Sequence, residues 1–393
     1  TQSISMEEYS RITPQIEDLT ERWSKNCHID RALYQKYDVK RGLRDANGRG
    51  VLASLTRISE VKGYTVDGND TIPCEGVLYY RGYDVRELVN GSLRDKRFGF
   101  EETIYLLLFG ELPTAAQLEE FRGLLNDYCG LPGSFVRDVI MKVPTGDMMN
   151  TLARAILTLY CYDNAANDIS LPNALRQCLQ LIANTPQLAI YSYQAYRARQ
   201  GHDLYLHVPN PELSMAENIL YLLRADKQYT ELEARALDAA LILHADHGSN
   251  NSTFTNHVVS SSGTDTYSAI TASLCSLKGP RHGGANIKVV QMIDDLKAHV
   301  SDWTAQIRSY LEDILAKRAF DGSGLIYGIG HAVYSLSDPR AEVLRKFAID
   351  ISREKGLSDE MELRLIVERV AREMLTARNG RPASSNVDFY SGF

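Results

Sequence analysis

Helix signals recur along this chain, whereas strand signals are sparse. The segment 100–121, FEETIYLLLFGELPTAAQLEEF, predicts two helices with a turn at 110–113 between them, and Thr114 is a suitable N-cap for the second helix. Apolar residues at helical spacing predict another helix over 151–161. Strands and helices do not alternate repeatedly, which argues against a doubly wound sheet. The sequence therefore predicts a mostly-α fold.

A capping box marks the clearest helix start. Thr230 and Glu233 form a T-x-x-E motif ahead of LEARALDAALILHADHG, and Gly248 is expected to end this helix. The main non-helical segments of the second half are expected at 248–263 and 322–330, which are rich in glycine and serine.

The one strand candidate lies at 63–81. Asp67-Gly68 and Glu75-Gly76 stand there between β-prone residues, which predicts a small hairpin ahead of a helix at Asp84.

Composition excludes several classes of protein. Of the 393 residues, 44% are apolar and 24% are charged, which is typical of a globular chain. The chain has 43 basic and 50 acidic residues, a formal net charge of −7, and no basic stripe, so no nucleic acid is expected as a partner. No run of 18 apolar residues occurs, so no membrane partner is expected either.

The cysteines and the first twenty residues indicate the compartment. The first twenty residues are polar and acidic and lack the features of a secretory signal. The cysteines are scattered without a C-x-x-C pair, which argues against a disulfide framework or a zinc knuckle and predicts a cytoplasmic protein. They are Cys27, Cys74, Cys129, Cys161, Cys178 and Cys275.

Three segments concentrate histidine and glycine, and the first is HADHGSNNSTF at 244–254. His244 and His247 are three residues apart, so both are expected on one helical face, followed by hydrogen-bond donors at 249–252. The motif is not the H-x-x-x-H of zinc enzymes, so no metal is predicted. A helix end at which the histidines simply pack explains the spacing equally well.

The second segment is KGPRHGGAN at 278–286. It places His282 just before an expected helix at 285–300, whose dipole disfavours an imidazolium. A neutral imidazole there could donate its N–H to an oxygen that gains negative charge. Gly283 and Gly284 would permit close approach of a ligand. The alternative is an ordinary Pro-His-Gly turn.

The third segment is GSGLIYGIGHAVYSLSDPR at 322–340. Tyr327 occupies the position at which a dinucleotide-binding G-x-G-x-x-G needs glycine, so we reject that motif. A loop that ends in His331 remains, and Asp338-Pro339 predicts the start of a helix. Arg340 falls in the first turn, where a cation opposes the dipole, so we expect it to bind an anionic ligand.

A carboxylate near the end of the chain is a further candidate. Asp388 lies among apolar residues in NVDFYSGF, where a raised pKa would suit a general base. The alternative is an aspartate that caps a helix beginning near Phe389.

In this order, HADH, KGPRHGGAN, GIGHAVY with DPR, and NVDFYSG resemble the citrate synthase family, as do LYYRGYDVREL and FEETIYLLLFGELPT. The resemblance extends from about residue 50. It implies a two-domain, almost all-helical homodimer with a small β-hairpin near 63–81, a large domain at 1–267 and a small domain at 268–393. The implied reaction condenses acetyl-CoA with oxaloacetate and hydrolyses the product to citrate and CoA, without a cofactor, because the CoA thioester is a substrate.

The resemblance also implies roles for individual residues. Asp388 would remove a proton from the acetyl methyl group, and His282 would donate to the enolate oxygen. His331 would hold and polarise the ketone of oxaloacetate, with His247 and Arg340 as further ligands of that substrate. The residues implied in CoA binding are Leu325, Ile326, Gly328, Gly330 and Arg381.

Some features depart from the family. Gly248 and Ile287 stand where many members carry glutamate, and Ser335 stands where some members carry a basic residue. Members continue beyond the position of residue 393 into a helical segment with two arginines, so we expect such a segment to be missing from this sequence. Three alternatives remain: a 2-methylcitrate synthase that uses propionyl-CoA, a His/Asp metal-dependent hydrolase, and an inactive helical scaffold.

Overall fold

A computed structural model describes residues 5–26, 28–40, 42–45, 50–248 and 250–393. The chain folds as two compact units, residues 1–53 and residues 54–393. The first unit contains α1 (Met6–Ser10), α2 (Pro14–Asn26) and α3 (Ala32–Lys36). The expected division of the chain between residues 267 and 268 is a different one and stays a prediction.

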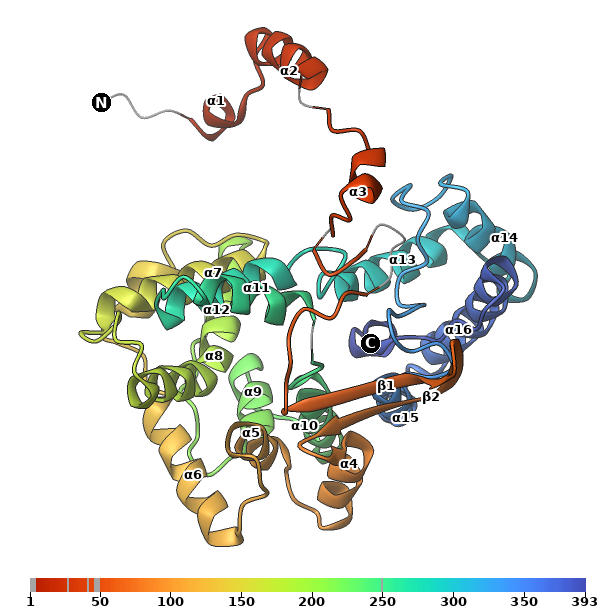
Figure 1. The fold of residues 1–393 in the computed structure, drawn as a ribbon. Coiled ribbons are helices and arrows are strands. Elements are labelled where there is room, and N and C mark those ends of the chain that lie inside the picture. Colours follow the sequence, from red (N-terminus) through yellow and green to blue (C-terminus); the bar gives the residue numbers. More distant parts are fainter. Residues whose placement is uncertain (1–4, 27, 41, 46–49, 249) are drawn as a thin grey trace. The chain divides into compact units, whose positions relative to one another are not determined.

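The second unit is built mainly from helices, as Figure 1 shows. Its first part contains α4 (Val85–Arg94), α5 (Phe100–Phe109), α6 (Ala115–Tyr128), a π-helical turn (Val136–Ile140), α7 (Met148–Leu159), a 3-10 turn (Tyr160–Tyr162), α8 (Leu171–Arg199), α9 (Met215–Leu223) and α10 (Glu231–His244). Its second part contains α11 (Asn251–Ser260), α12 (Thr266–Leu277), α13 (Ala285–His299), α14 (Trp303–Leu315), α15 (Pro339–Glu354), α16 (Ser358–Asn379) and α17 (Val387–Ser391). The predicted mostly-α fold is confirmed.

The predicted capping residues begin their helices. Thr114 forms a reciprocal capping box with Gln117 at α6, and Thr230 forms one with Glu233 at α10. Asp84 caps α4 through its side chain. These motifs satisfy the free N–H groups of a first turn within four residues, so the local sequence is sufficient to specify them.

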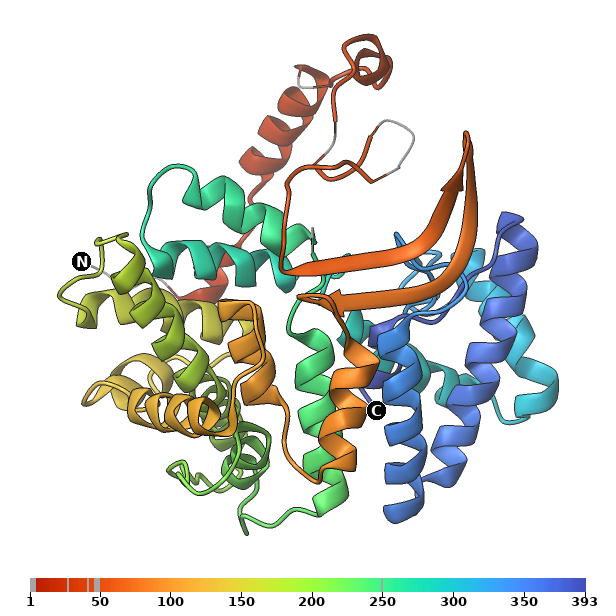
Figure 2. The ribbon, with the colours of Figure 1, turned by 60° about the horizontal axis from the view of Figure 1, so that its bottom comes forward.

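A long antiparallel hairpin is the main β element. The strands β1 (Ser59–Asp67), β2 (Asp70–Tyr80) and β3 (Tyr83–Asp84) pair in the order β1-β2-β3. Asp67 pairs with Asp70, so Gly68 at a φ of 62° lies in the turn, whereas Gly76 lies inside β2. A Cβ at Gly76 would meet the carbonyl oxygen of Ser337 at 2.1 Å. The hairpin therefore packs tightly on the loop before α15, and Figure 2 shows β2 beside that helix.

Two sequence predictions about the region 244–263 were wrong. Helix α10 ends at His244, so His247 lies beyond it and does not share its face. Helix α11 occupies 251–260, inside a segment expected to be non-helical. Asn250 caps it by accepting a hydrogen bond from the Thr253 amide at 2.9 Å. The small polar residues lowered the helical signal, but they also supply the cap that starts the helix.

Packing centres on α10, which contacts α4, α5, α9 and α15. The largest hydrophobic cluster joins the hairpin, α4 and α10 to α13, α14, α15, α16 and α17, and it includes the fully buried Leu78, Leu243 and Phe389. Burying a phenylalanine contributes about 1.5–3 kcal/mol, so Phe389 anchors the short helix α17. A second cluster joins α7, α8 and α12.

No helix within the described ranges is long and apolar enough to cross a membrane.

Candidate active site

The predicted ligands His247 and His331 lie together, although 84 positions separate them. Their rings meet edge to face at 5.2 Å between centroids. Tyr334 contacts both of them: its ring stacks on His331 at 4.7 Å, and its hydroxyl lies 3.1 Å from Nε2 of His247. Burial raises the pKa of Tyr334 and lowers that of His247 well below its ordinary value, with the charge of Arg340 adding to the second effect. The cluster therefore holds a protonated phenol and a neutral imidazole near pH 7.

The backbone determines the tautomer of His331. Its Nδ1 accepts hydrogen bonds from the amides of Val333 at 3.0 Å and Tyr334 at 3.2 Å. An imidazole nitrogen that accepts does not carry a proton, so the proton of the neutral ring resides on Nε2. His331 can therefore act as a hydrogen-bond donor through Nε2.

Arg340 is buried at the start of α15. The N-cap Asp338 accepts from its backbone amide at 3.0 Å, from Nε at 3.1 Å and from Nη2 at 2.9 Å. The guanidinium also lies 5.8 Å from the centroid of the Tyr334 ring. The buried Asp338 carboxylate is enough to explain why a cation such as Arg340 is tolerated in the first turn, so no bound ligand is needed to explain it. The bonds to Asp338 involve Nε and Nη2, which leaves Nη1 for a further acceptor.

Asp388 is fixed to the loop that precedes His331. Asn386 N donates to the Gly328 carbonyl at 2.8 Å, and the Asn386 side-chain amide donates to the Gly330 carbonyl at 2.8 Å. Asp388 lies in the first turn of α17. The N-cap of this helix is Asn386, so the alternative in which Asp388 caps the helix is wrong. Burial raises the pKa of Asp388 to about 6, and Arg340 opposes that rise. The site therefore contains a carboxylate of increased basicity.

His282 lies two residues before the N-cap of α13. Its Nε2 is 2.8 Å from Oγ of Ser252, which also lies 3.1 Å from the Ser273 carbonyl. A hydroxyl carries one proton, so Ser252 either donates to Nε2, leaving the ring proton on Nδ1, or donates to Ser273 and accepts from Nε2. Burial lowers the pKa of His282, which favours the neutral ring expected from the sequence.

The loop of His282 is connected to the helix of Asp388 through α13. The side-chain amide of Asn286 donates to the Ser391 hydroxyl, and a Cβ at Gly392 would meet the Val290 side chain at 2.8 Å. Helices α13 and α17 thus place both predicted catalytic residues on one packed assembly.

The two glycines after His282 have a structural explanation. A Cβ at Gly283 would meet the Leu277 side chain at 2.4 Å, and one at Gly284 would meet the Lys278 carbonyl at 2.5 Å. Their absent side chains let the turn fold back on the end of α12, so the glycines do not require the close ligand approach inferred from the sequence.

The predicted CoA-binding residues occupy the loop before His331 and the turn after α16. Ile326 is buried and Leu325 is half exposed at 51%. Gly328 has a φ of 83° and packs on Phe389, where a Cβ would come within 2.9 Å of the ring. Arg381 is exposed. The loop is therefore tied to α17, and its role in CoA binding stays a prediction.

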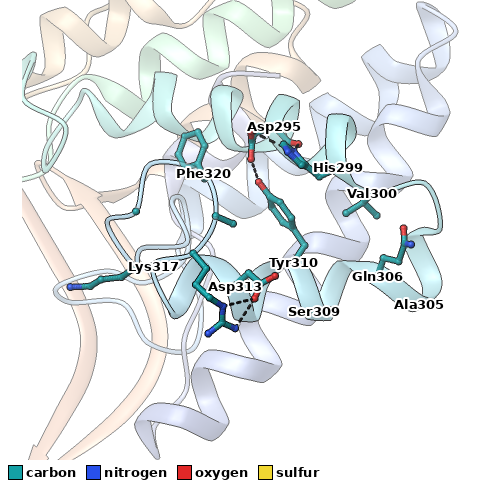
Figure 3. Close-up of a pocket in the computed structure, with 13 residues that line it drawn as sticks. Asp295, His299, Val300, Ala305, Gln306, Ser309, Tyr310, Asp313, Lys317 and Phe320 are labelled. Atoms are coloured by element: carbon teal, nitrogen blue, oxygen red, sulfur yellow. Dashed lines mark hydrogen bonds and ion pairs between the residues drawn. The ribbon is translucent and has the colours of Figure 1, made fainter.

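A pocket of about 790 Å³ lies elsewhere, between the end of α13, α14 and residues 317–322. Figure 3 shows Tyr310 directing its hydroxyl at Asp295, with His299 alongside. None of the predicted site residues lines this pocket.

Sequence reasoning did not assign a role in the site to three residues that organise it. They are Tyr334, which joins the two histidines, Asp338, which holds Arg340, and Ser252, which contacts His282. Tyr334 lies three residues after His331 in the motif GIGHAVY, and that spacing was a usable signal. Ser252 belongs to the polar run 249–252, of which Ser249 lies outside the described residues.

Comparison with known proteins identifies the family. The family model described as "Citrate synthase, C-terminal domain" matches residues 43–393. A citrate synthase from Synechocystis sp. is 33% identical over 347 residues, covering 87% of this chain and 78% of the relative, and one from Deinococcus radiodurans is 34% identical over 345 residues, covering 87% and 82%.

Solved structures agree with these relatives. The citrate synthase of Pyrobaculum aerophilum superposes with a TM-score of 0.70 at 29% identity, covering 87% of this chain and 79% of that one. The citrate synthase of Thermoplasma acidophilum, described as a ternary complex with carboxymethyl coenzyme A and oxaloacetate, has a TM-score of 0.71 at 25% identity, covering 87% and 81%. This chain therefore belongs to the citrate synthase family.

Proposed function

We propose that this chain condenses acetyl-CoA with oxaloacetate and hydrolyses the resulting thioester to citrate and CoA. The observation that carries this proposal is the backbone pairing of residues 328–330 with 384–386. This pairing holds together the segments of His331, whose tautomer is defined, and of Asp388, whose pKa is raised. Family membership supports the same reaction, and so does the ternary complex of the Thermoplasma acidophilum relative, which contains a CoA derivative together with oxaloacetate.

Asp388 acts as the general base. A methyl C–H beside a thioester is a very weak acid, so a useful base needs a pKa near the working pH. Burial raises the pKa of Asp388 to about 6, which leaves the carboxylate ionised at pH 7 and more basic than an exposed aspartate. Asp388 takes the methyl proton and leaves an enolate on the thioester.

His282 stabilises that enolate as a neutral donor. When the Ser252 hydroxyl donates to Nε2, the ring proton resides on Nδ1 and can be donated to the developing oxyanion. A lowered pKa suits this role, because a neutral imidazole retains its N–H without the desolvation cost of a charged ring. The enolate carbon then attacks the ketone of oxaloacetate.

His331, His247 and Arg340 bind oxaloacetate. Nε2–H of His331 donates to the ketone oxygen and polarises it, because Nδ1 already accepts two backbone hydrogen bonds. His247 contributes a second neutral ring, and Nη1 of Arg340 donates to a carboxylate of the substrate. Arg340 is well suited to this task because Asp338 fixes the plane of its guanidinium.

The loop of Leu325, Ile326, Gly328 and Gly330 receives CoA through its backbone groups, and Arg381 adds charge near the phosphates. Closure of residues 268–393 over 1–267 keeps water from the thioester until the carbon–carbon bond has formed. A movement of this kind would act on both the His331 loop and α17, which are hydrogen-bonded to each other.

The functional unit is a homodimer in the cytoplasm. Helix α11 packs on α12 yet buries none of its own residues within the chain, and Val258 on α11 is 55% exposed. A second copy of the chain would cover this face. The cytoplasmic location is supported by the described cysteines, all of which are free thiols.

A thiol-release assay tests this function. We expect CoA to appear only when oxaloacetate and an acyl-CoA are both present, with a chelator having no effect. A higher kcat/KM for acetyl-CoA than for propionyl-CoA assigns the substrate, whereas the reverse preference assigns a 2-methylcitrate synthase. Loss of thiol release on chelation would contradict the proposal and support a metal-dependent hydrolase.

A further inference from the structure

Three charged side chains recur every four residues along α16. Arg364, Glu368 and Arg372 occupy consecutive turns and so share one face of the helix. Arg364 and Glu368 are each only 5% exposed. This face, which we call the α16 ladder, points to the segment 383–390 that carries Asp388.

Each residue of the ladder binds that segment. Arg372 donates from Nε to the Ala383 carbonyl at 3.2 Å, and Arg364 donates from Nη1 to the Phe389 carbonyl at 2.9 Å. Between them, the Glu368 carboxylate accepts hydrogen bonds from the hydroxyls of Ser385 and Tyr390. The hydrogen bonds therefore hold Asp388 from both sides along the chain.

The ladder also contacts the elements that carry the other site residues. Nη2 of Arg372 donates to the Leu336 carbonyl at 3.2 Å, in the loop between His331 and Arg340. Arg345, on the same helix as Arg340, lies 3.9 Å from Glu368. One helix thus contacts the segment of the proposed base and also the loop and the helix that carry His331 and Arg340.

Stability alone explains this arrangement poorly. Burial lowers the pKa of Arg364, and its Nε has no hydrogen-bond partner although it is buried. Well-packed apolar residues are often as stable as buried charges, because removing a charge from water costs several kcal/mol. Charged groups add directional hydrogen bonds. The carboxylate and the two guanidiniums therefore fix the orientation of the backbone groups and hydroxyls that they bind.

We propose that Arg364, Glu368 and Arg372 are positioning residues that hold the Asp388 carboxylate in line for proton abstraction. The proposal rests on the proposed function of Asp388. A misplacement of about 1 Å can cost about 10²-fold in rate. Because the two hydroxyls that Glu368 binds both lie in the segment of Asp388, loosening the ladder at Glu368 should slow C–H cleavage more than it weakens substrate binding.

Glu368→Ala tests the proposal, with Asp163→Ala as the matched control. The Asp163 carboxylate is also largely shielded, at 9% side-chain exposure, and it accepts hydrogen bonds from Tyr267 at 2.6 Å and from Arg176 at 2.9 Å. Its partner Tyr267 belongs to the second hydrophobic cluster, away from the α16 ladder. Both variants should lower the melting temperature. Only Glu368→Ala should lower kcat by about 10²-fold, with both KM values within about twofold of the unmodified chain.

The deuterium isotope effect with trideuterated acetyl-CoA gives the sharper readout. It should rise in Glu368→Ala, because proton abstraction becomes rate-limiting, and stay unchanged in Asp163→Ala. Glu368→Gln retains one acceptor and should recover most of the rate. If Glu368→Ala is too unstable to assay, Tyr390→Phe and Ser385→Ala each remove a single hydroxyl and should show the same isotope signature at about tenfold loss.

The outcomes separate the two proposals. If Asp388→Ala is inactive but Glu368→Ala and Tyr390→Phe match the control in kcat and isotope effect, the positioning role is wrong and the base remains. If Asp388→Ala retains full activity, the proposed function of Asp388 is wrong. Amide exchange tests placement without activity: Glu368→Ala should accelerate exchange in 384–390 more than Asp163→Ala does, and equal exchange would overturn the ladder.

Discussion

The backbone amide of Gly330 donates a 2.7 Å hydrogen bond to the carbonyl oxygen of Ser384. This bond joins the residue before His331 to a residue four positions before Asp388. An isolated bridge between Ile329 and Ser385 continues the pairing. Two residues with separate tasks in the proposed reaction are thereby placed by one short stretch of antiparallel backbone.

Asn386 offers a way to weaken this junction. Its side chain both caps α17 and donates to the Gly330 carbonyl. We expect Asn386→Ala to lose about 1 kcal/mol of stability with the cap and to lower kcat as well. Asn386→Ser retains a capping oxygen but is too short to reach Gly330, so its melting temperature should stay near that of the unmodified chain while kcat falls. An unchanged kcat in Asn386→Ser would show that the side-chain link is dispensable.

Tyr334→Phe should weaken oxaloacetate binding. The change removes the hydroxyl that lies 3.1 Å from His247 but keeps the ring stacked on His331. A hydrogen bond of this kind contributes about 1 kcal/mol, so KM for oxaloacetate should rise about fivefold, with a smaller effect on kcat. Tyr191→Phe, which removes a hydroxyl bound to the His207 carbonyl, serves as the control. Steady-state kinetics with varied oxaloacetate measures both, and equal KM values in the two variants would count against a role for Tyr334.

Ser252→Ala should affect the chemical step. In the arrangement in which Ser252 donates to Nε2, the hydroxyl keeps the ring proton of His282 on Nδ1, so removing it deprives the enolate of an oriented donor. We expect kcat to fall by about tenfold or more, with KM for oxaloacetate unchanged. Ser252→Thr retains the hydroxyl and should recover activity, whereas a Thr variant as slow as the Ala variant would argue against the hydrogen bond. Ser92→Ala, at a buried serine on α4, controls for loss of a hydroxyl.

The raised pKa of Asp388 predicts how activity depends on pH. The base is active when ionised, so kcat/KM for acetyl-CoA should fall as the pH drops through about 6. A profile that stays flat down to pH 5 would contradict this assignment.

Ionisation of Asp388 should favour catalysis but lower the stability of the folded protein. Because the folded pKa exceeds the ordinary value, the folded state binds the proton more tightly, and stability decreases as the pH rises from about 4 to about 6. Asp388→Asn should therefore raise the melting temperature at pH 7, and the gain should shrink below pH 6.

Asp321→Asn provides the control of opposite sign. Hydrogen bonds from Tyr327 and Ser323 overcome the effect of burial and lower the pKa of Asp321 to about 2, so its ionised form is stabilising. The variant should lower the melting temperature at pH 7. If the melting temperatures of Asp388→Asn and Asp321→Asn shift in the same direction, the shifts do not arise from the titration of these carboxylates.

Local signals account for what the sequence predicted well. Thr230, Thr114 and Asp338 begin their helices through contacts within a few residues, so a single stretch of sequence is enough to recognise them. The same reasoning fails at α11, because serine and asparagine are typical of loops, whereas here Asn250 caps the helix.

The site required more than local signals. The bond from Gly330 to Ser384 and the contact of Ser252 with His282 join segments whose separation is set by tertiary packing, and no spacing rule predicts them. His282, His331 and Asp388 could be named because their motifs resemble a known family. Glu368 has no motif, and its importance emerges only from the hydroxyls that the fold places around it.

Turnover by Asp388→Ala, compared with the unmodified chain, tests the proposed chemistry most directly. CoA release should be measured with saturating acetyl-CoA and oxaloacetate, after circular dichroism has shown that both proteins are folded. We predict steady CoA release by the unmodified chain and a loss of at least about 10²-fold in the variant, because no other group would take the methyl proton. Turnover by folded Asp388→Ala within a few-fold of the unmodified rate would contradict the assignment of Asp388 as the base.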